Sequence, residues 1–134
     1  MWEFPPEIKD VKMFEVTYET TFCATHRLTR DEEPIEPNHG HDWRVEAVAA
    51  GKDLDGLGVV IDFEHLKKAV GEVAATFHYR DMNEHPGLRG LSPSAEVVAR
   101  YFFDEVRKGL GPEGRLLRRV RVWEAPGCSA SYAE

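Results

Sequence analysis

The feature that most constrains the fold is the order of two hydrophobic periodicities along the chain of 134 residues. Residues 13–22 and 39–50 alternate apolar and polar side chains, the pattern of a strand with one buried face. Two later segments repeat apolar residues at three- and four-residue steps, as amphipathic helices do. Residues 116–124 and 129–133 alternate again. The order ββααββ predicts an α+β fold, an antiparallel four-stranded sheet with two helices on one face.

Capping residues predict where the two helices begin. Asp62 is the expected N-cap of the first helix. Ser92 is the expected N-cap of the second, with Pro93 at the first helical position. The apolar stripes expected to be buried are Phe63, Leu66, Val70, Val73 and Phe77 in the first helix, and Val97, Tyr101, Phe102 and Val106 in the second.

The rest of the chain predicts one domain over residues 1–134, with residues 1–10 as a loose arm. The net charge of −7 argues against a nucleic-acid partner, which normally requires a basic face. The apolar runs are too short to span a bilayer, and no basic segment precedes an apolar core at the N-terminus, so we expect a cytoplasmic protein. A sheet with one open face and two open edges also predicts a homo-oligomer.

The sharpest chemical signal is the motif His39-Gly40-His41. Residues two apart in a strand point to the same side, so both imidazoles can reach one ion. His26 has the parity of the apolar face of the preceding strand, which would place it beside the pair. Three imidazoles with an open fourth position are the pattern of a catalytic zinc site, although they also suit other divalent metals. A rival arrangement closes a structural site with Cys23, whose side chain should point away from that of His26.

Six short motifs occur in one order along the chain. They are FCATHRL at 22–28, HGHDW at 39–43, GVVIDF at 58–63, RDMNE at 80–84, PSAE at 93–96 and VRVWE at 120–124. In this order they resemble the 6-pyruvoyl-tetrahydropterin synthase and 6-carboxytetrahydropterin synthase family, over about residues 13 to 133. The resemblance implies a tunnelling fold (T-fold) that assembles as trimers or as a hexamer made of two trimers.

The resemblance also implies a substrate and roles for particular residues. The family acts on 7,8-dihydroneopterin triphosphate with a catalytic Zn²⁺, here held by His26, His39 and His41. By motif position Glu124 grips the pterin ring, since a carboxylate can accept two parallel hydrogen bonds from the ring. Ser94 and Glu96 fall where the family shapes the pterin pocket, although on their own they predict helix capping.

The chain departs from the family at its proton-transfer groups. Ile35 occupies the position of the usual catalytic Cys, and His78-Tyr79 replaces the usual Asp-His pair. Glu36 resembles the family branch in which a Glu replaces the Cys and the product is 6-hydroxymethyl-7,8-dihydropterin, a folate precursor. A carboxylate beside Zn²⁺ can act as a general base, but Glu36 also fits a solvated acidic loop. His78 is a second acid–base candidate, or a structural histidine.

These observations leave three functional hypotheses. The first is a zinc-dependent lyase acting on dihydroneopterin triphosphate, with Glu36 as base and 6-hydroxymethyl-7,8-dihydropterin as the favoured product. Its close alternative forms a 6-carboxytetrahydropterin, as in queuosine-type pathways, or a 6-pyruvoyl product. The second hypothesis is a zinc- and pterin-binding protein that has lost the chemistry of the family. The third is a purely structural zinc domain.

Overall fold

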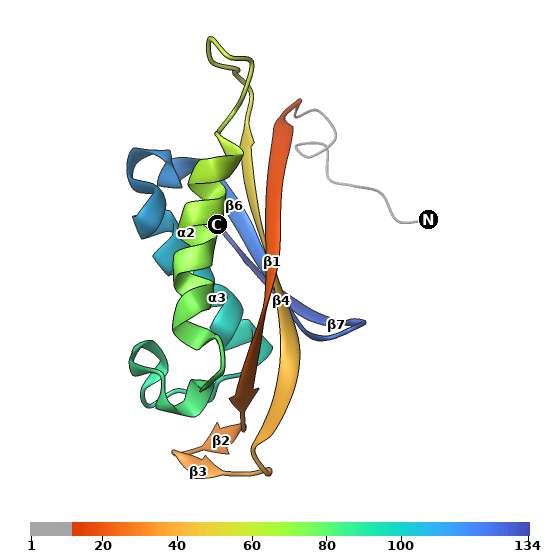
Figure 1. Cartoon of the computed structure of the whole chain (residues 1–134), viewed down its shortest axis with the longest axis vertical. Helices are drawn as coiled ribbons and strands as arrows, with labels where there is room; N and C mark the ends of the chain where they lie inside the picture. The colour runs from red at the N-terminus through yellow and green to blue at the C-terminus, as the bar shows by residue number, and fades with distance from the viewer. Residues whose placement is uncertain (1–11) are drawn as a thin grey trace.

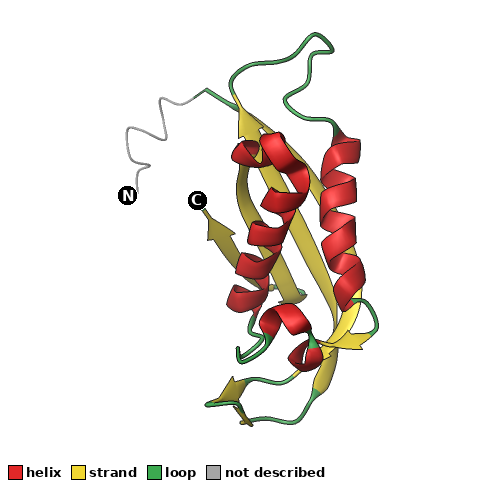
Figure 2. Ribbon diagram, turned by 90° about the vertical axis from the view of Figure 1, so that its left-hand side faces the viewer, coloured by secondary structure: helices red, strands yellow, loops and turns green. Residues whose placement is uncertain are grey.

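The computed structural model describes residues 12–134, so the predicted arm at residues 1–10 lies outside the described residues. The long strands β1 (Phe14–His26) and β4 (His39–Gly51) pair antiparallel from end to end. β4 also pairs with β6 (Leu117–Ala125), and β6 pairs with β7 (Cys128–Ala133), both antiparallel. The helices α2 (Phe63–Phe77) and α3 (Ala95–Leu110) cover one face of this sheet (Figures 1 and 2). The predicted α+β class and helix layer are confirmed.

The predicted number of strands is wrong, because two short pairings were not expected. β5 (Arg80–Asp81) joins β1 in parallel, so the main sheet has five strands in the order β5-β1-β4-β6-β7. β2 (Thr29–Arg30) and β3 (Glu33–Pro34) form a separate two-stranded sheet. Strands of two residues carry no readable alternation, and their charged, Pro-containing surroundings predicted loops. Residues 12–134 also contain three short 3₁₀ helices: η1 (Met82–Glu84), η2 (Pro86–Leu88) and η3 (Gly111–Leu116).

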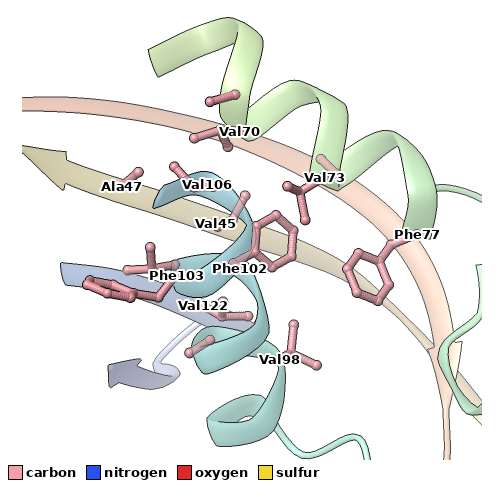
Figure 3. Packing of buried hydrophobic residues seen from close by; sticks show 14 of the residues in the cluster. Val45, Ala47, Val70, Val73, Phe77, Val98, Phe102, Phe103, Val106 and Val122 are labelled. Carbon is pink, nitrogen blue, oxygen red and sulfur yellow. The ribbon is translucent and has the colours of Figure 1, made fainter. Parts of the chain in front are cut away.

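The hydrophobic core lies between the helix layer and the sheet. From β4, Trp43, Val45 and Ala47 are completely buried, as the alternation predicted. The ring of Phe22 stacks against Trp43 on β4, Phe77 on α2 and Phe102 on α3, so one side chain joins both layers. Figure 3 shows how the valines and phenylalanines of the two helices interlock above the strands. Full burial of each such side chain contributes about 1.5–3 kcal/mol.

The start of α3 differs from the prediction. Ser94, not Ser92, is the N-cap, and its hydroxyl accepts a hydrogen bond from Val97 N at 3.2 Å. The Ser92 hydroxyl instead accepts from Thr29 N at 2.9 Å, which ties the approach to α3 to the end of β1. Pro93 is therefore buried just ahead of the helix. The local sequence allowed either serine to cap, and the contact with Thr29 decided between them.

The first helix begins where predicted, since Asp62 accepts a hydrogen bond from Glu64 N at 2.8 Å. The buried stripes differ at a few positions. Phe63 is 61% exposed, and α3 buries Val98 and Phe103 in place of Val97 and Tyr101, which are only half-buried. Within residues 12–134, no helix is both long and apolar enough to cross a membrane.

Candidate metal centre

Three histidines converge where β1 ends and β4 begins. His26 is the last residue of β1 and lies opposite His39, the first residue of β4. The ring centroids of His26 and His39 are 4.6 Å apart, and those of His39 and His41 are 4.8 Å apart. His26 is 1% exposed, whereas the other two rings are half-buried. The antiparallel register therefore brings together the three residues predicted from the motif spacing.

Glu124 reaches the same point from β6. Its Oε1 atom lies 2.9 Å from His41 Nε2, 3.1 Å from His26 Nε2 and 3.8 Å from His39 Nε2. Ligand atoms from all four residues lie within 4.8 Å of one another. The sequence analysis assigned Glu124 only to the pterin ring. Glu124 follows Val120 and Val122 at two-residue steps along the strand. This alternation places its side chain on the face of the sheet that carries the histidines.

Two of the imidazoles are oriented by backbone carbonyl groups. His26 Nδ1 lies 2.8 Å from Pro93 O, and His39 Nδ1 lies 2.9 Å from Pro37 O. Because a carbonyl oxygen only accepts, each Nδ1 must carry the proton. In the neutral ring the Nε2 atom then carries a lone pair, which is directed toward Glu124. Such carbonyl-oriented imidazoles are the usual arrangement of histidine metal ligands.

His26 Nε2 and Glu124 Oε1 lie at hydrogen-bonding distance, 3.1 Å, but a neutral His26 with its proton on Nδ1 cannot donate across that contact. The lone pairs of His26 and His39 face a carboxylate oxygen, which is also an acceptor. His41 Nε2 is buried and makes no hydrogen bond among the described residues, although Glu124 Oε1 is 2.9 Å away. Acceptors that converge in this way are satisfied either by a second proton on an imidazole or by a bound cation. Imidazole nitrogens with a carboxylate oxygen form a donor set that fits Zn²⁺.

A register irregularity in β6 places Glu124. Trp123 pairs with Ser129 of β7 and Ala125 pairs with Cys128, so Glu124 is an extra residue between the two pairs. Such bulges re-aim a side chain and are common beside functional sites. On the opposite face, the Arg44 guanidinium stacks 3.6 Å above the ring of Trp123 and holds that neighbour in place.

Glu36 lies in the loop between the strands that carry the histidines, outside the four-residue cluster. Its Oε1 atom accepts a hydrogen bond from Leu28 N at 2.9 Å, and Ile35 N donates to Leu28 O at 3.0 Å. These bonds tie residues 35 and 36 to a point two residues after His26. The carbonyl of Pro37, which orients His39, follows immediately.

His78 and Tyr79 lie on the other side of β1. His78 Nδ1 accepts a hydrogen bond from Cys23 N at 3.1 Å, and Tyr79 N donates to Cys23 O at 2.7 Å. Tyr79 is 81% exposed and has a φ of 59°, a strained value for a residue other than glycine. Neither side chain joins the histidine cluster.

Cys23 does not join the cluster either, as its strand parity predicted. Its Sγ atom donates to Asp42 Oδ1 at 2.6 Å on the open face of the sheet. This hydrogen bond raises the pKa of the Cys23 thiol above its ordinary value. A hollow of 470 Å³ on this side is lined by Cys23, Asp42, Tyr79, Arg80 and neighbouring residues. The ligand set with Cys23 is therefore not the one that the fold assembles.

Ser94 and Glu96 lie at the start of α3. Ser94 caps the helix directly after Pro93, whose carbonyl orients His26. Glu96 is exposed and lines a hollow of 540 Å³ together with Arg100 and Tyr132. The structure thus connects Ser94 with the histidine cluster through one backbone carbonyl, while Glu96 faces a separate surface depression.

The fold is α+β, and a cluster of three histidines and one glutamate that could hold a metal ion lies at one end of its longest strands. Residues 15–134 match the family model for 6-pyruvoyl tetrahydropterin synthase, and the chain belongs to this family. It is 34% identical over 105 residues to an Archaeoglobus fulgidus protein with a provisional 6-carboxy-5,6,7,8-tetrahydropterin synthase name. That match covers 78% of this chain and 83% of the relative.

Solved structures confirm the fold. The 6-pyruvoyl tetrahydropterin synthase of Caenorhabditis elegans superimposes with a TM-score of 0.83 at 21% identity, covering 92% of this chain and 96% of the other. A Plasmodium vivax 6-pyruvoyltetrahydropterin synthase, in a variant with a catalytic glutamate replaced by alanine, superimposes with a TM-score of 0.74 at 18% identity. It covers 92% of this chain and 99% of that chain.

Proposed function

We propose that this protein is a zinc-dependent lyase that cleaves the side chain of 7,8-dihydroneopterin triphosphate and forms 6-hydroxymethyl-7,8-dihydropterin. The observation that carries the proposal is the convergence of His26, His39 and His41 in a pterin synthase fold. These three imidazoles would hold the ion, which when bound supplies Lewis-acid polarisation of the substrate's side-chain oxygens. The residues of the chain must then bind the ring and move the protons.

Glu124 is the proposed anchor for the pterin ring. Its carboxylate is 32% exposed and can accept a charge-assisted pair of hydrogen bonds from the ring's amino group and adjacent N–H. Ser94 and Glu96 are proposed to shape the pocket around the ring. For Ser94 the support is its position next to Pro93, because any shift of that turn would also move the carbonyl that orients His26.

Glu36 is the proposed general base. Ile35 cannot transfer protons, whereas the Glu36 carboxylate is held near the histidine-bearing strand ends by its bond to Leu28 N. The Plasmodium vivax structural neighbour also has a glutamate described as catalytic. His78 is the proposed second acid–base group. Its Nδ1 accepts from Cys23 N, so the neutral ring carries its proton on Nε2.

The decisive experiment is mass spectrometry of the products formed by the zinc-loaded protein from dihydroneopterin triphosphate, with wild type compared to Glu36→Gln. The glutamine amide oxygen can still accept from Leu28 N, so the loop should keep its structure. We expect 6-hydroxymethyl-7,8-dihydropterin from wild type, and turnover about 10²- to 10⁴-fold lower in the variant with unchanged zinc content. Glu33→Gln, in the same acidic loop, is the matched control and should retain turnover.

Any other result would change the proposed base, the proposed product or the proposed activity. Full turnover by Glu36→Gln would remove Glu36 from the mechanism. A 6-carboxytetrahydropterin product would establish the alternative activity, which the name of the Archaeoglobus fulgidus relative favours. Unchanged substrate would leave a zinc- and pterin-binding protein without the chemistry of the family.

We further propose that the protein acts as a homo-oligomer, either a trimer or a dimer of trimers. Among the described residues, β1 pairs with β5 only at Ala24 and Thr25, so most of its outer edge is unpaired. β7 forms the opposite edge of the sheet. Unpaired edges invite pairing with another strand, and two edges on one subunit allow a closed ring. Light scattering on the purified protein would measure the assembly.

A further inference from the structure

We infer that Glu124 is an exchangeable fourth metal ligand, which closes the metal site when no substrate is bound and leaves it when a pterin ring binds. The inference rests on the proposed function, because it uses the pterin ring as the competing partner. It differs from the sequence prediction of a site with a permanently open fourth position. Glu124 then has two roles, and it performs them one at a time.

The position of the Glu124 oxygen fits the corner of a tetrahedron. With Zn–N and Zn–O bonds of about 2.0–2.2 Å, neighbouring ligand atoms of a tetrahedral zinc site lie about 3.3 Å apart. The distances from Glu124 Oε1 to the three Nε2 atoms are 2.9, 3.1 and 3.8 Å, which bracket that value. If the three imidazoles held a metal ion, the carboxylate oxygen would lie within reach of its fourth ligand position.

The histidines are held more firmly than the carboxylate. His26 and His39 are fixed at their Nδ1 atoms by Pro93 O and Pro37 O, and His41 lies within the continuous pairing of β1 with β4. Glu124 instead projects from a bulge near the end of β6, and among the described residues no backbone group is hydrogen-bonded to its carboxylate. All three contacts to the rings use one oxygen, Oε1. A side-chain rotation can therefore withdraw Glu124 while the histidines stay in place.

Binding a pterin ring requires such a rotation. The ring's amino group and adjacent N–H lie in one plane and need both carboxylate oxygens in that plane. In the observed position three imidazole nitrogens lie within 3.8 Å of Oε1, so this oxygen already faces the histidines rather than a ring edge. Glu124 must turn outward to pair with the pterin. That movement opens the fourth position when a substrate is present to use it.

The mechanism predicts that pterin and metal ion compete for Glu124. By linkage, a ring that removes a ligand from the metal must lower the affinity for the metal, and the metal must lower the affinity for the ring by the same factor. If the Glu124 carboxylate anchored the ring but never bound the metal, the pterin would not lower the affinity for the metal. The two roles of Glu124 can thus be separated by measurement.

The test uses the full chain loaded with Co²⁺, whose visible absorption reports the number and geometry of its ligands, and unsubstituted pterin as the probe. Unsubstituted pterin has no side-chain oxygens with which to bind the metal. We expect pterin to change the wild-type spectrum toward that of metal-loaded Glu124→Ala, and to leave the spectrum of the variant unchanged. Chelator competition should show Zn²⁺ affinity at least about tenfold lower in the variant, since even outer-shell changes cost that much.

Two further variants control for folding and for charge. Glu124→Gln keeps the shape of the side chain and should also weaken Zn²⁺ binding. If Zn²⁺ binding is weak in Glu124→Ala but normal in Glu124→Gln, misfolding of the Ala variant is the cause. Asp42→Asn removes the same charge beside His41, but on the opposite face of the sheet, where Asp42 contacts Cys23. It should retain the wild-type spectrum and the wild-type response to pterin.

The inference is overturned if Glu124→Ala has the spectrum and Zn²⁺ affinity of wild type, whether or not the enzyme turns over. It is also overturned if pterin binds to wild type, as its fluorescence reports, without changing the Co²⁺ spectrum. The proposed function would survive both results. A protein that neither binds pterin nor converts dihydroneopterin triphosphate would refute both the exchange and the proposed function.

Discussion

The two buried histidines of this protein differ in how their ring nitrogens are paired. His26 is 1% exposed and is contacted by Pro93 and Glu124 from distant parts of the chain, whereas His85 is 9% exposed and is held by the nearby residues Gly87 and Thr76. The Nδ1 atom of His85 accepts from Gly87 N at 3.0 Å, and its Nε2 lies 2.9 Å from the Thr76 hydroxyl. That hydroxyl donates to Val73 O, so Nε2–H is the donor to Thr76. Every polar atom of the His85 ring has a matching partner.

In its neutral form, the ring of His26 has a matching hydrogen-bond partner on one side only. Its Nδ1 donates to Pro93 O, while its Nε2 faces the Glu124 carboxylate and two other imidazoles. Burial of a polar group without a partner costs free energy, so a fold retains it only when something else compensates. The difference shows that burial alone does not identify a functional histidine. What distinguishes a ligand is the nitrogen that the protein leaves without a donor.

The largest effect that would sharpen this comparison is the loss of metal binding on removing a histidine from the cluster. His39→Ala is the best choice, because its ring is half-buried and the change should spare the core. We expect Zn²⁺ affinity to fall more than about 100-fold, beyond the 10- to 100-fold cost of outer-shell changes. Chelator competition measures it, with His85→Ala as the control. Equal affinities in the two variants would erase the distinction between the histidines.

The next effect is on the free energy of unfolding, which we expect to depend more on His85 than on the histidines of the metal cluster. His85→Ala removes a ring stacked 4.3 Å from Phe77, leaves Gly87 N without its acceptor, and leaves the Thr76 hydroxyl only its bond to Val73 O. We expect the free energy of unfolding to fall by about 1–3 kcal/mol with zinc stoichiometry unchanged. Urea denaturation measures the loss. His65→Ala removes only an exposed pair with Glu113 and should cost less than about 1 kcal/mol.

The smallest effect is the pH dependence that His85 adds to stability. Burial, followed by the charge of Arg80, lowers the pKa of His85 below its ordinary value of 6.5, and Glu105 opposes the shift weakly. The unfolded chain therefore binds more protons below pH 6.5, so His85 makes stability rise with pH up to about that value. Denaturation of wild type and His85→Gln across this range should show a shallower rise in the variant. Parallel curves would contradict the lowered pKa.

Strand alternation and helical periodicity were enough to predict most of the fold. The predicted strand faces at Phe22, Trp43 and Val120 are buried, and Asp62 caps α2 as expected. The fifth strand, the β2–β3 pair and the choice of Ser94 as cap were missed. The fifth strand and the cap depend on contacts between segments far apart in sequence, such as Ala24 with Arg80 and Thr29 with Ser92. The β2–β3 pair is a local hairpin whose two-residue strands are too short to show alternation.

By itself the sequence determined which side chains share a face, because alternation follows from the geometry of a single strand. It therefore placed His39 and His41 together and separated Cys23 from His26. Only the tertiary structure decided which faces meet. The register of β1 against β4 set His26 opposite His39, and the pairing of β6 with β4 brought Glu124 to the same end of the sheet. Register depends on pairing between strands, so the fourth member of the site appeared only once the sheet was assembled.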